Sequence, residues 1–215
     1  MGMARLLIHE GGILNASVYR IDGPDGPEFV EKDFSTAPWL VRNTVGRFLA
    51  WREEAILRRL ERSTDAVPRG ARRVSPFCLR EEFVSGETIR DRSDRAGREG
   101  IDRRSGRLFG REFMDALERK VRDVHRARFV HLDLHNARNV IVGPGENPVI
   151  VDWQSAVSTA LMPPPLRRAL EKIDLMGVLK FREKFRPGDL TPQERLSLDR
   201  SRFLRRHFWV PRFHR

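Results

Sequence analysis

The chain has 215 residues with 41 basic and 30 acidic side chains, a net charge of +11 and a single cysteine, Cys78. This length suits one large domain or two small lobes, and the single cysteine excludes an internal disulfide or a thiolate metal cluster. No apolar run approaches the roughly 20 residues that span a bilayer, and the N-terminal apolar stretch is too short for a signal peptide. We therefore predict a cytoplasmic protein, or one peripheral to the inner face of a membrane.

The positive charge is concentrated toward the C-terminus. Residues 166–215 contain 14 basic and six acidic side chains, a local excess of eight positive charges. This distribution favours anionic partners such as nucleotides, nucleic acid, phospholipid or lipopolysaccharide. A solvated arginine-rich surface without any partner explains the composition equally well.

The first part of the chain is predicted to form an antiparallel meander followed by a helix. Apolar and β-branched residues predict strands over 5–9, 16–21 and 28–34, and a further short strand or two over 77–84. Helical spacing of apolar residues over 43–62 predicts a helix, with Glu53 on its apolar face. Because an unpaired carboxylate on such a face is costly, we expect Glu53 to have a cationic partner. Trp39, Trp51 and Trp209 are predicted to be packing residues and not base-stacking platforms.

Residues 90–107 are almost entirely polar and are predicted to form an exposed, mobile connector. We place a lobe boundary just before it, so that residues 1–89 form an N-lobe and residues 90–215 form a C-lobe. A second amphipathic helix is predicted over 113–128. Two more helices are predicted over 163–185 and 191–208, the last with a capping box formed by Thr191 and Glu194.

A β-hairpin is the clearest local structure in the sequence. Strands over 140–142 and 149–151 flank a turn at 143–148. If Val142 pairs with Val149, Asn139 lies opposite Asp152, and directly paired side chains have Cβ atoms about 5 Å apart. This register predicts two oxygen ligands side by side at the open end of the hairpin.

Asp133, Asn139 and Asp152 together suit phosphoryl transfer. A magnesium-bound triphosphate requires hard oxygen ligands for the metal and a separate carboxylate that orients or deprotonates the attacking hydroxyl. Asn139 and Asp152 suit the first task, and Asp133 suits the second. Singly, Asp133 is explained as the cap of a turn and Asp152 as the end of a strand, but their joint spacing favours a shared site.

Lys32 is the only lysine among the first 119 residues, in a strand whose surroundings otherwise use arginine. A compact ammonium reaches between phosphate oxygens and a carboxylate where a planar guanidinium fits poorly. We predict that Lys32 pairs with Glu53, and the alternative is a solvated strand lysine. The pattern His131-x-Asp133-x-His135 lacks a second histidine group with ligand spacing, so a loop histidine bonded to the backbone is predicted rather than a metal cluster.

These residues resemble the protein-kinase-like phosphotransferases, in particular the compact RIO-type kinases, the bacterial Kdo and heptose lipopolysaccharide kinases, and the aminoglycoside phosphotransferases. Phe29-Val-Glu-Lys32 resembles the strand of the phosphate-binding lysine, with Glu53 as its helix partner. Glu82-Phe-Val-Ser-Gly86 is similar to the hinge that contacts adenine. His131-Leu-Asp133 resembles the catalytic loop, and Val149-Ile-Val-Asp-Trp153 resembles the metal-binding segment.

The resemblance implies an α+β, two-lobed kinase-like fold with a small antiparallel β N-lobe and a mainly helical C-lobe. It implies ATP and Mg²⁺ as cofactors and a hydroxyl acceptor, either a protein serine or threonine or a lipopolysaccharide core sugar. The implied site residues are catalytic Asp133 and His131, metal-binding Asn139 and Asp152, and nucleotide-binding Lys32, Glu53, Gly11 and Glu82.

Two departures from the family pattern leave an alternative open. Of the three glycines expected in the phosphate-binding loop, only Gly11 is present. The interval from Asp133 to Asn139 is six residues instead of five, which requires either a bulge, the interpretation we favour, or assistance from Asn136. The alternative is therefore a catalytically weak pseudokinase or a basic nucleic-acid-binding protein, although nucleic acid is the less favoured partner.

Overall fold

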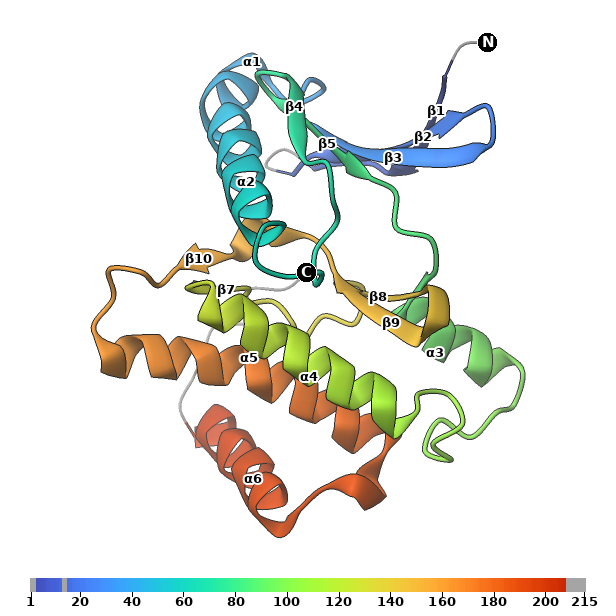
Figure 1. Cartoon of the computed structure of the whole chain (residues 1–215), viewed down its shortest axis with the longest axis vertical. Helices are drawn as coiled ribbons and strands as arrows, with labels where there is room; N and C mark the ends of the chain where they lie inside the picture. The colour runs from blue at the N-terminus through green and yellow to red at the C-terminus, as the bar shows by residue number, and fades with distance from the viewer. Residues whose placement is uncertain (1–2, 13–14, 208–215) are drawn as a thin grey trace.

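A computed structural model describes residues 3–12 and 15–207 of the chain (Figure 1). The first part of the chain forms a five-stranded sheet with the strand order β1-β2-β3-β5-β4 and antiparallel pairing throughout. Its strands are β1 (Ala4–His9), β2 (Ser17–Gly23), β3 (Gly26–Asp33), β4 (Arg72–Ser75) and β5 (Cys78–Glu82). The predicted meander is confirmed, and β5 lies within the predicted strand segment 77–84.

One helical segment packs against this sheet. It consists of α1 (Trp39–Val41), the π-helical turn η1 (Arg42–Gly46) and α2 (Arg47–Leu60), and α2 contacts β4 and β5. The buried positions of α2, which include Glu53, recur at helical spacing and confirm the predicted apolar face. The packing role is wrong for two of the three tryptophans, because Trp39 is 68% exposed and Trp51 is 51% exposed. Trp209 lies outside the described residues.

The remainder of the chain is mainly helical (Figure 1). Its helices are α3 (Ile89–Arg98), α4 (Arg111–Arg126), α5 (Pro164–Phe185) and α6 (Pro192–His207). Two small sheets accompany them, one of β7 (Phe129–Val130) with β10 (Val157–Ser158), and one of β6 (Glu87–Thr88), β8 (Val140–Gly143) and β9 (Asn147–Ile150) in the order β6-β8-β9. Single helical turns are η2 (Pro144–Glu146), η3 (Trp153–Ser155) and η4 (Pro187–Asp189). Among these described helices, none has both the length and the apolar content needed to cross a membrane.

The predicted capping box begins α6. The backbone N–H of Thr191 donates to Glu194 Oε2 at 2.7 Å, and the backbone N–H of Glu194 donates to Thr191 Oγ1 at 3.2 Å. Two N–H groups at the helix start that have no partner within the helix are thereby satisfied.

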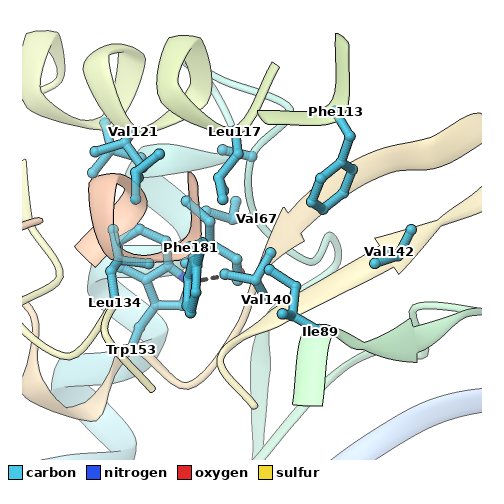
Figure 2. Packing of buried hydrophobic residues seen from close by; sticks show 14 of the residues in the cluster. Val67, Ile89, Phe113, Leu117, Val121, Leu134, Val140, Val142, Trp153 and Phe181 are labelled. Carbon is cyan, nitrogen blue, oxygen red and sulfur yellow. Dashed lines mark hydrogen bonds between the residues drawn. The ribbon is translucent and has the colours of Figure 1, made fainter. Parts of the chain in front are cut away.

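Side chains from α4, α5 and the β8–β9 hairpin meet in one buried core, which Figure 2 shows from close by. Trp153 is fully buried there, and its indole N–H donates to the carbonyl of Ile150 at 3.0 Å. The core therefore fixes the end of β9 and the residues that follow it. Packing at the usual interior density leaves these backbone segments little freedom to shift.

The predicted connector over 90–107 is wrong in its first half, which forms α3. The hydroxyl of Thr88 accepts the backbone N–H of Asp91 at 3.0 Å and so caps the helix. One face buries Ile89, Ser93 and Ala96, while arginines and carboxylates four residues apart pair on the exposed face. Because few residues of this segment are buried, its composition is mostly polar and gives only a weak helical signal.

The predicted hairpin register is also wrong, by one residue. Val142 pairs with Pro148, and a three-residue turn joins Gly143 to Asn147. Because β9 is an edge strand, a proline without an N–H group can take part in the pairing, whereas the prediction had assigned it to the turn. Asn139 therefore lies beside Val151, whose N–H donates to the Asn139 carbonyl at 2.9 Å, and does not directly face Asp152.

Candidate active site

A buried lysine on β3 lies among three carboxylates. Lys32 is 8% exposed, and its ammonium donates a hydrogen bond to Oε1 of Glu53, which is 2% exposed. The Lys32 Nζ atom lies 3.8 Å from Asp152 Oδ1 and 4.0 Å from Glu81 Oε1. The structure thus brings together residues from β3, α2, β5 and the segment after β9 around one cation.

The charges in this cluster determine how its members titrate. Burial alone would lower the pKa of Lys32, but the carboxylates of Glu53, Glu81 and Asp152 raise it well above its ordinary value. Burial also raises the pKa of Glu81 to about 7, against an opposing effect of Lys32. Within the described residues, Glu81 Oε2 has no hydrogen-bond partner. The ammonium donates its hydrogen bond to Glu53, while Glu81 takes up a proton near neutral pH.

Glu81 should make stability fall as the pH rises toward neutrality. Its carboxyl titrates near 4.5 ordinarily and near 7 in the folded protein. Between these values the folded state binds more protons than the unfolded state, so the free energy of unfolding decreases as pH increases. In the variant Glu81→Gln this decrease should be absent when urea unfolding is compared at about pH 5 and about pH 8. Glu82→Gln, which changes the exposed neighbouring carboxylate, should keep the wild-type decrease. A wild-type pH dependence of Glu81→Gln would show that Glu81 is not its source.

His131 holds the loop after β7 in place. Its Nδ1 accepts the backbone N–H of Asp133 at 3.3 Å, so its Nε2 carries the proton and donates to the Val151 carbonyl at 3.1 Å. Burial lowers the pKa of His131, which is 1% exposed, so the ring is neutral at neutral pH. The histidine therefore connects the loop to the strand end that precedes Asp152, and it bonds to the backbone as predicted.

The side chain of Asp133 lies among polar groups of its own loop. Asn139 Nδ2 donates to Asp133 Oδ2 at 2.8 Å and to the Asp133 carbonyl at 3.1 Å. Asn136 Nδ2 lies 3.4 Å from the same carboxylate oxygen, and His135 Nδ1 lies 3.4 Å from Oδ1. A turn from Asn136 to Asn139 accommodates the extra residue of the interval. The loop is thus lengthened by a turn, as the favoured interpretation expects, while a part of Asn136 in metal binding stays a prediction.

The same loop is held from α5 by Asp174, whose side chain is completely buried. Its carboxylate accepts the N–H groups of His131 at 2.8 Å and Leu132 at 2.7 Å, and it lies 3.1 Å from Nε2 of His125. Leu132 has a φ of 68°, a left-handed conformation that is strained for a residue other than glycine. Gly177, one turn further along α5, lets the helix approach, because a Cβ atom there would lie 2.9 Å from the loop backbone.

Replacing Asp174 with asparagine should lower the free energy of unfolding by about 2–4 kcal/mol, because two buried N–H groups and an imidazole lose a charged acceptor. Urea unfolding measures the change. The control Glu183→Gln removes a carboxylate from the more exposed side of the same helix and should cost at most about 1 kcal/mol. Equal stability of Asp174→Asn and the wild type would contradict this role.

Asp152 lies two residues beyond the end of β9 and has a left-handed conformation, with φ 63° and ψ 72°. Such a conformation costs roughly 1–2 kcal/mol for a residue other than glycine, so the neighbouring contacts must maintain it. The backbone N–H of Trp153 donates to Glu53 Oε1 at 3.2 Å, and the Arg52 guanidinium donates to the Gln154 carbonyl at 2.8 Å. The Asp152 side chain remains 49% exposed. Helix α2 thus holds this segment with one face of the carboxylate near Lys32 and the rest accessible.

The two predicted metal ligands differ in accessibility, because Asn139 is buried and the Asp152 side chain is half exposed. The amide nitrogen of Asn139 donates to Asp133, so the amide oxygen is the Asn139 atom that could bind a metal ion. Asp152 offers an accessible carboxylate. In the described part of the chain, no group of three or more His, Cys, Asp or Glu side chains is arranged to hold a metal ion. Magnesium is usually held by one or two carboxylates together with substrate phosphates and water. This donor set fits a magnesium ion that binds together with a nucleotide.

Two further predicted nucleotide contacts lie at chain turns. The N–H of Gly11 donates to Ser17 Oγ at 3.1 Å, and a Cβ atom on Gly11 would lie 2.3 Å from the Asn15 carbonyl oxygen. This position therefore requires glycine, while residues 13–14 of the same loop lie outside the described residues. Glu82 ends β5 with an exposed side chain, and its N–H donates to the Arg69 carbonyl at 2.9 Å. Contact of Gly11 and Glu82 with a nucleotide stays a prediction.

Comparison with known proteins relates this geometry to a fold. No family model matches the sequence, and no curated protein matches it either. Among solved structures, the Rio2 kinase–ADP/Mg²⁺–phosphoaspartate complex from Chaetomium thermophilum is similar, with a TM-score of 0.58 and 16% identity over 93% of this chain and 61% of that chain. The chain has the protein-kinase-like fold.

The predicted fold class is thereby confirmed. The small antiparallel sheet with α2 corresponds to the N-lobe of this fold, and the mainly helical remainder corresponds to the C-lobe. The chain spans about 61% of the length of that Rio2 kinase. Because 893 solved chains match, the architecture is a common one, and the activity has to be argued from the site itself.

Two residues of the site, Glu81 and Asp174, were not predicted from the sequence. Alternation along β5 places Glu81 on the same face as Leu79, which pairs with Lys32. Asp174 precedes the buried Val178 by four residues on α5, so it lies on an apolar helix face as Glu53 does. Its position on an apolar helix face therefore indicates a buried, partnered carboxylate, as the position of Glu53 does.

Proposed function

We propose that this protein is an ATP- and magnesium-dependent phosphotransferase that transfers the γ-phosphate to a hydroxyl group. The observation that carries the proposal is the position of Lys32, buried between Glu53 of α2 and Asp152 just beyond β9. A salt bridge that served stability alone would not require a third carboxylate held in a left-handed conformation and half exposed. The ADP and Mg²⁺ present in the similar Rio2 kinase structure support the choice of nucleotide and metal.

The nucleotide phosphates would bind beside this cluster. The ammonium of Lys32 neutralises α- and β-phosphate oxygens, and Glu53 keeps the ammonium oriented. Asn139 and Asp152 are the residues that would hold Mg²⁺, which when bound neutralises charge on the phosphate oxygens. Phosphoryl transfer depends mainly on positioning and charge neutralisation, so the rigid contacts of Glu53 with Lys32 and Trp153 are part of the catalytic arrangement.

Asp133 orients the acceptor hydroxyl and accepts its proton. The acceptor oxygen forms a bond to the γ-phosphorus, the bond to the β–γ bridging oxygen breaks, and ADP leaves. The amides of Asn139 and Asn136 hold Oδ2 of Asp133, while His131 and Asp174 fix the loop backbone. The carboxylate is thus positioned before the acceptor arrives.

We propose a protein serine or threonine, or a lipopolysaccharide core sugar, as the acceptor. The net charge of +11 favours an anionic acceptor. The exposed apolar side chains of Trp39, Leu40, Phe48 and Trp51 on α1 and α2 suit peripheral contact with a membrane at its cytoplasmic face. These two features favour the glycolipid acceptor over the protein acceptor.

Transfer of labelled phosphate from ATP tests the proposed function. Purified lipopolysaccharide core and a protein extract are supplied separately, each with and without Mg²⁺. Magnesium-dependent labelling of one acceptor supports the proposal and identifies the acceptor class. ATP binding without transfer to either acceptor would instead favour a pseudokinase.

A further inference from the structure

A pocket is lined by residues from the C-terminal end of α4, the turn after it and the N-terminal half of α5. Figure 1 shows that these two helix segments lie below β7 and β10. The volume of the pocket is about 460 Å³. It is lined by four arginines, one histidine, one carboxylate and one apolar residue: Arg122, Arg126, Arg128, Arg167, His125, Glu171 and Leu175. None of these residues belongs to the Lys32 cluster described above.

The sequence spacing explains why these side chains converge. Arg122 and Arg126 are four residues apart on α4, and Arg167 and Glu171 are four residues apart on α5, so each pair lies on one helix face. Arg128 follows α4 directly in a left-handed conformation with a φ of 66°. The backbone turn at Arg128 thus adds a fourth guanidinium to a pocket between two helices.

The charge of the pocket is not balanced by its own lining. The lining contains four guanidinium groups and one carboxylate, and like charges repel each other at short range. Arg122 pairs with Glu118 at 2.6 Å, Arg167 pairs with Glu171 at 3.5 Å, and Arg126 pairs with Asp123, so three of the four arginines have a partner within their own helix. Exposed pairs within one helix are worth only about 0.3–0.5 kcal/mol, so an anion of higher charge competes with them easily. Arg128 makes no ion pair within the described residues.

We propose that this pocket binds a phosphate group, as inorganic phosphate or as a phosphomonoester, through Arg126, Arg128 and Arg167. Guanidinium groups donate paired N–H groups with the spacing of phosphate oxygens, which makes arginine clusters selective for this anion. A pocket of about 460 Å³ that is open to solvent has room for a single phosphate with a small substituent. A nucleic-acid strand would need an extended basic groove with aromatic side chains, which this pocket does not provide.

The pocket adjoins the network that holds the catalytic loop. His125 lines the pocket, and its Nε2 lies 3.1 Å from the Asp174 carboxylate that accepts N–H groups of His131 and Leu132. A bound phosphate would therefore lie close to residues that fix the loop carrying Asp133. The proposed site is nevertheless separate from the nucleotide site, and its binding is measurable without any phosphotransfer.

Titration with inorganic phosphate and with glycerol phosphate, in the absence of ATP and at constant ionic strength, tests the proposal. The pocket variant is Arg126→Gln with Arg128→Asn, because asparagine tolerates the left-handed conformation at residue 128. The control, Arg95→Gln with Arg202→Gln, removes the same charge from two exposed, paired arginines elsewhere. Calorimetry should show at least about tenfold weaker binding in the pocket variant and a change below about twofold in the control.

Three results would overturn the proposal. These are the absence of binding of both probes to the wild type, unchanged binding in the pocket variant, and an equal loss in both variants, which would indicate attraction by net charge alone. Thermal unfolding of both variants verifies that they fold. Vesicles containing phosphatidic acid distinguish the source of the phosphate. If the wild type binds them through these arginines more tightly than it binds glycerol phosphate, the ligand is a lipid headgroup. If it binds them more weakly, the ligand is a soluble phosphomonoester.

Discussion

The variant Asp133→Asn is expected to lose phosphotransfer by about 10²–10⁴-fold, the usual contribution of a positioned acid or base, while its ATP affinity stays nearly unchanged. The substitution removes the negative charge that receives the acceptor proton. It keeps one side-chain oxygen that can still accept the Asn139 amide, so the loop should keep its conformation. Initial rates and calorimetric ATP binding measure the two effects separately.

A matched variant shows whether the loss is specific to this carboxylate. Asp94→Asn removes a carboxylate from α3 that is hydrogen-bonded to Arg90 at 2.7 Å and should leave turnover unchanged. Full turnover of Asp133→Asn would show that another group accepts the proton. A parallel loss of ATP binding and transfer would show that the residue acts on the nucleotide instead.

Replacing Lys32 with methionine is expected to cost about 3–5 kcal/mol of unfolding free energy, because Glu53 would be left as a buried, unpaired charge. Adding Glu53→Gln should recover most of this stability, since the neutral amide oxygen can still accept the Trp153 N–H. ATP binding and transfer should remain absent in both variants because neither has the ammonium. Urea unfolding and nucleotide titration measure the stability and the binding.

The double variant separates the structural role of Lys32 from its chemical role. Lys172→Met, which removes an exposed lysine from α5, should change neither stability nor transfer. Wild-type stability of Lys32→Met would contradict the buried ion pair. Wild-type transfer by the Lys32→Met/Glu53→Gln protein would show that the ammonium is not part of the active site.

Residues whose surroundings are set by local pattern were predicted well. Glu53 was assigned a cation because a carboxylate on the apolar face of α2 cannot stay unpaired, and the structure places Lys32 against it. The capping box of α6 was predicted from Thr191 and Glu194 alone, because capping depends on residues within one helical turn. In both cases the signal that supports the prediction lies within a few residues of one helix.

The predictions that failed depended on choices that local pattern does not determine. The hairpin register depended on whether Pro148 belongs to the turn or to β9, and only the edge position of β9 resolves this. The polar segment that forms α3 contributes only a few small residues to the core, so its apolar face is too weak a signal against its charge. Glu81 required the pairing of β3 with β5, which joins residues about 50 positions apart.

The most direct test of the proposed site is calorimetric ATP binding, with and without Mg²⁺, by the wild type and by Asp152→Ala. We expect the wild type to bind ATP more tightly when Mg²⁺ is present, and Asp152→Ala to lose that difference. Asp25→Ala, which removes an exposed carboxylate in the β2–β3 turn, should behave like the wild type. Absence of ATP binding by the wild type, or an equal effect of Mg²⁺ on the wild type and Asp152→Ala, would contradict the proposed metal–nucleotide site.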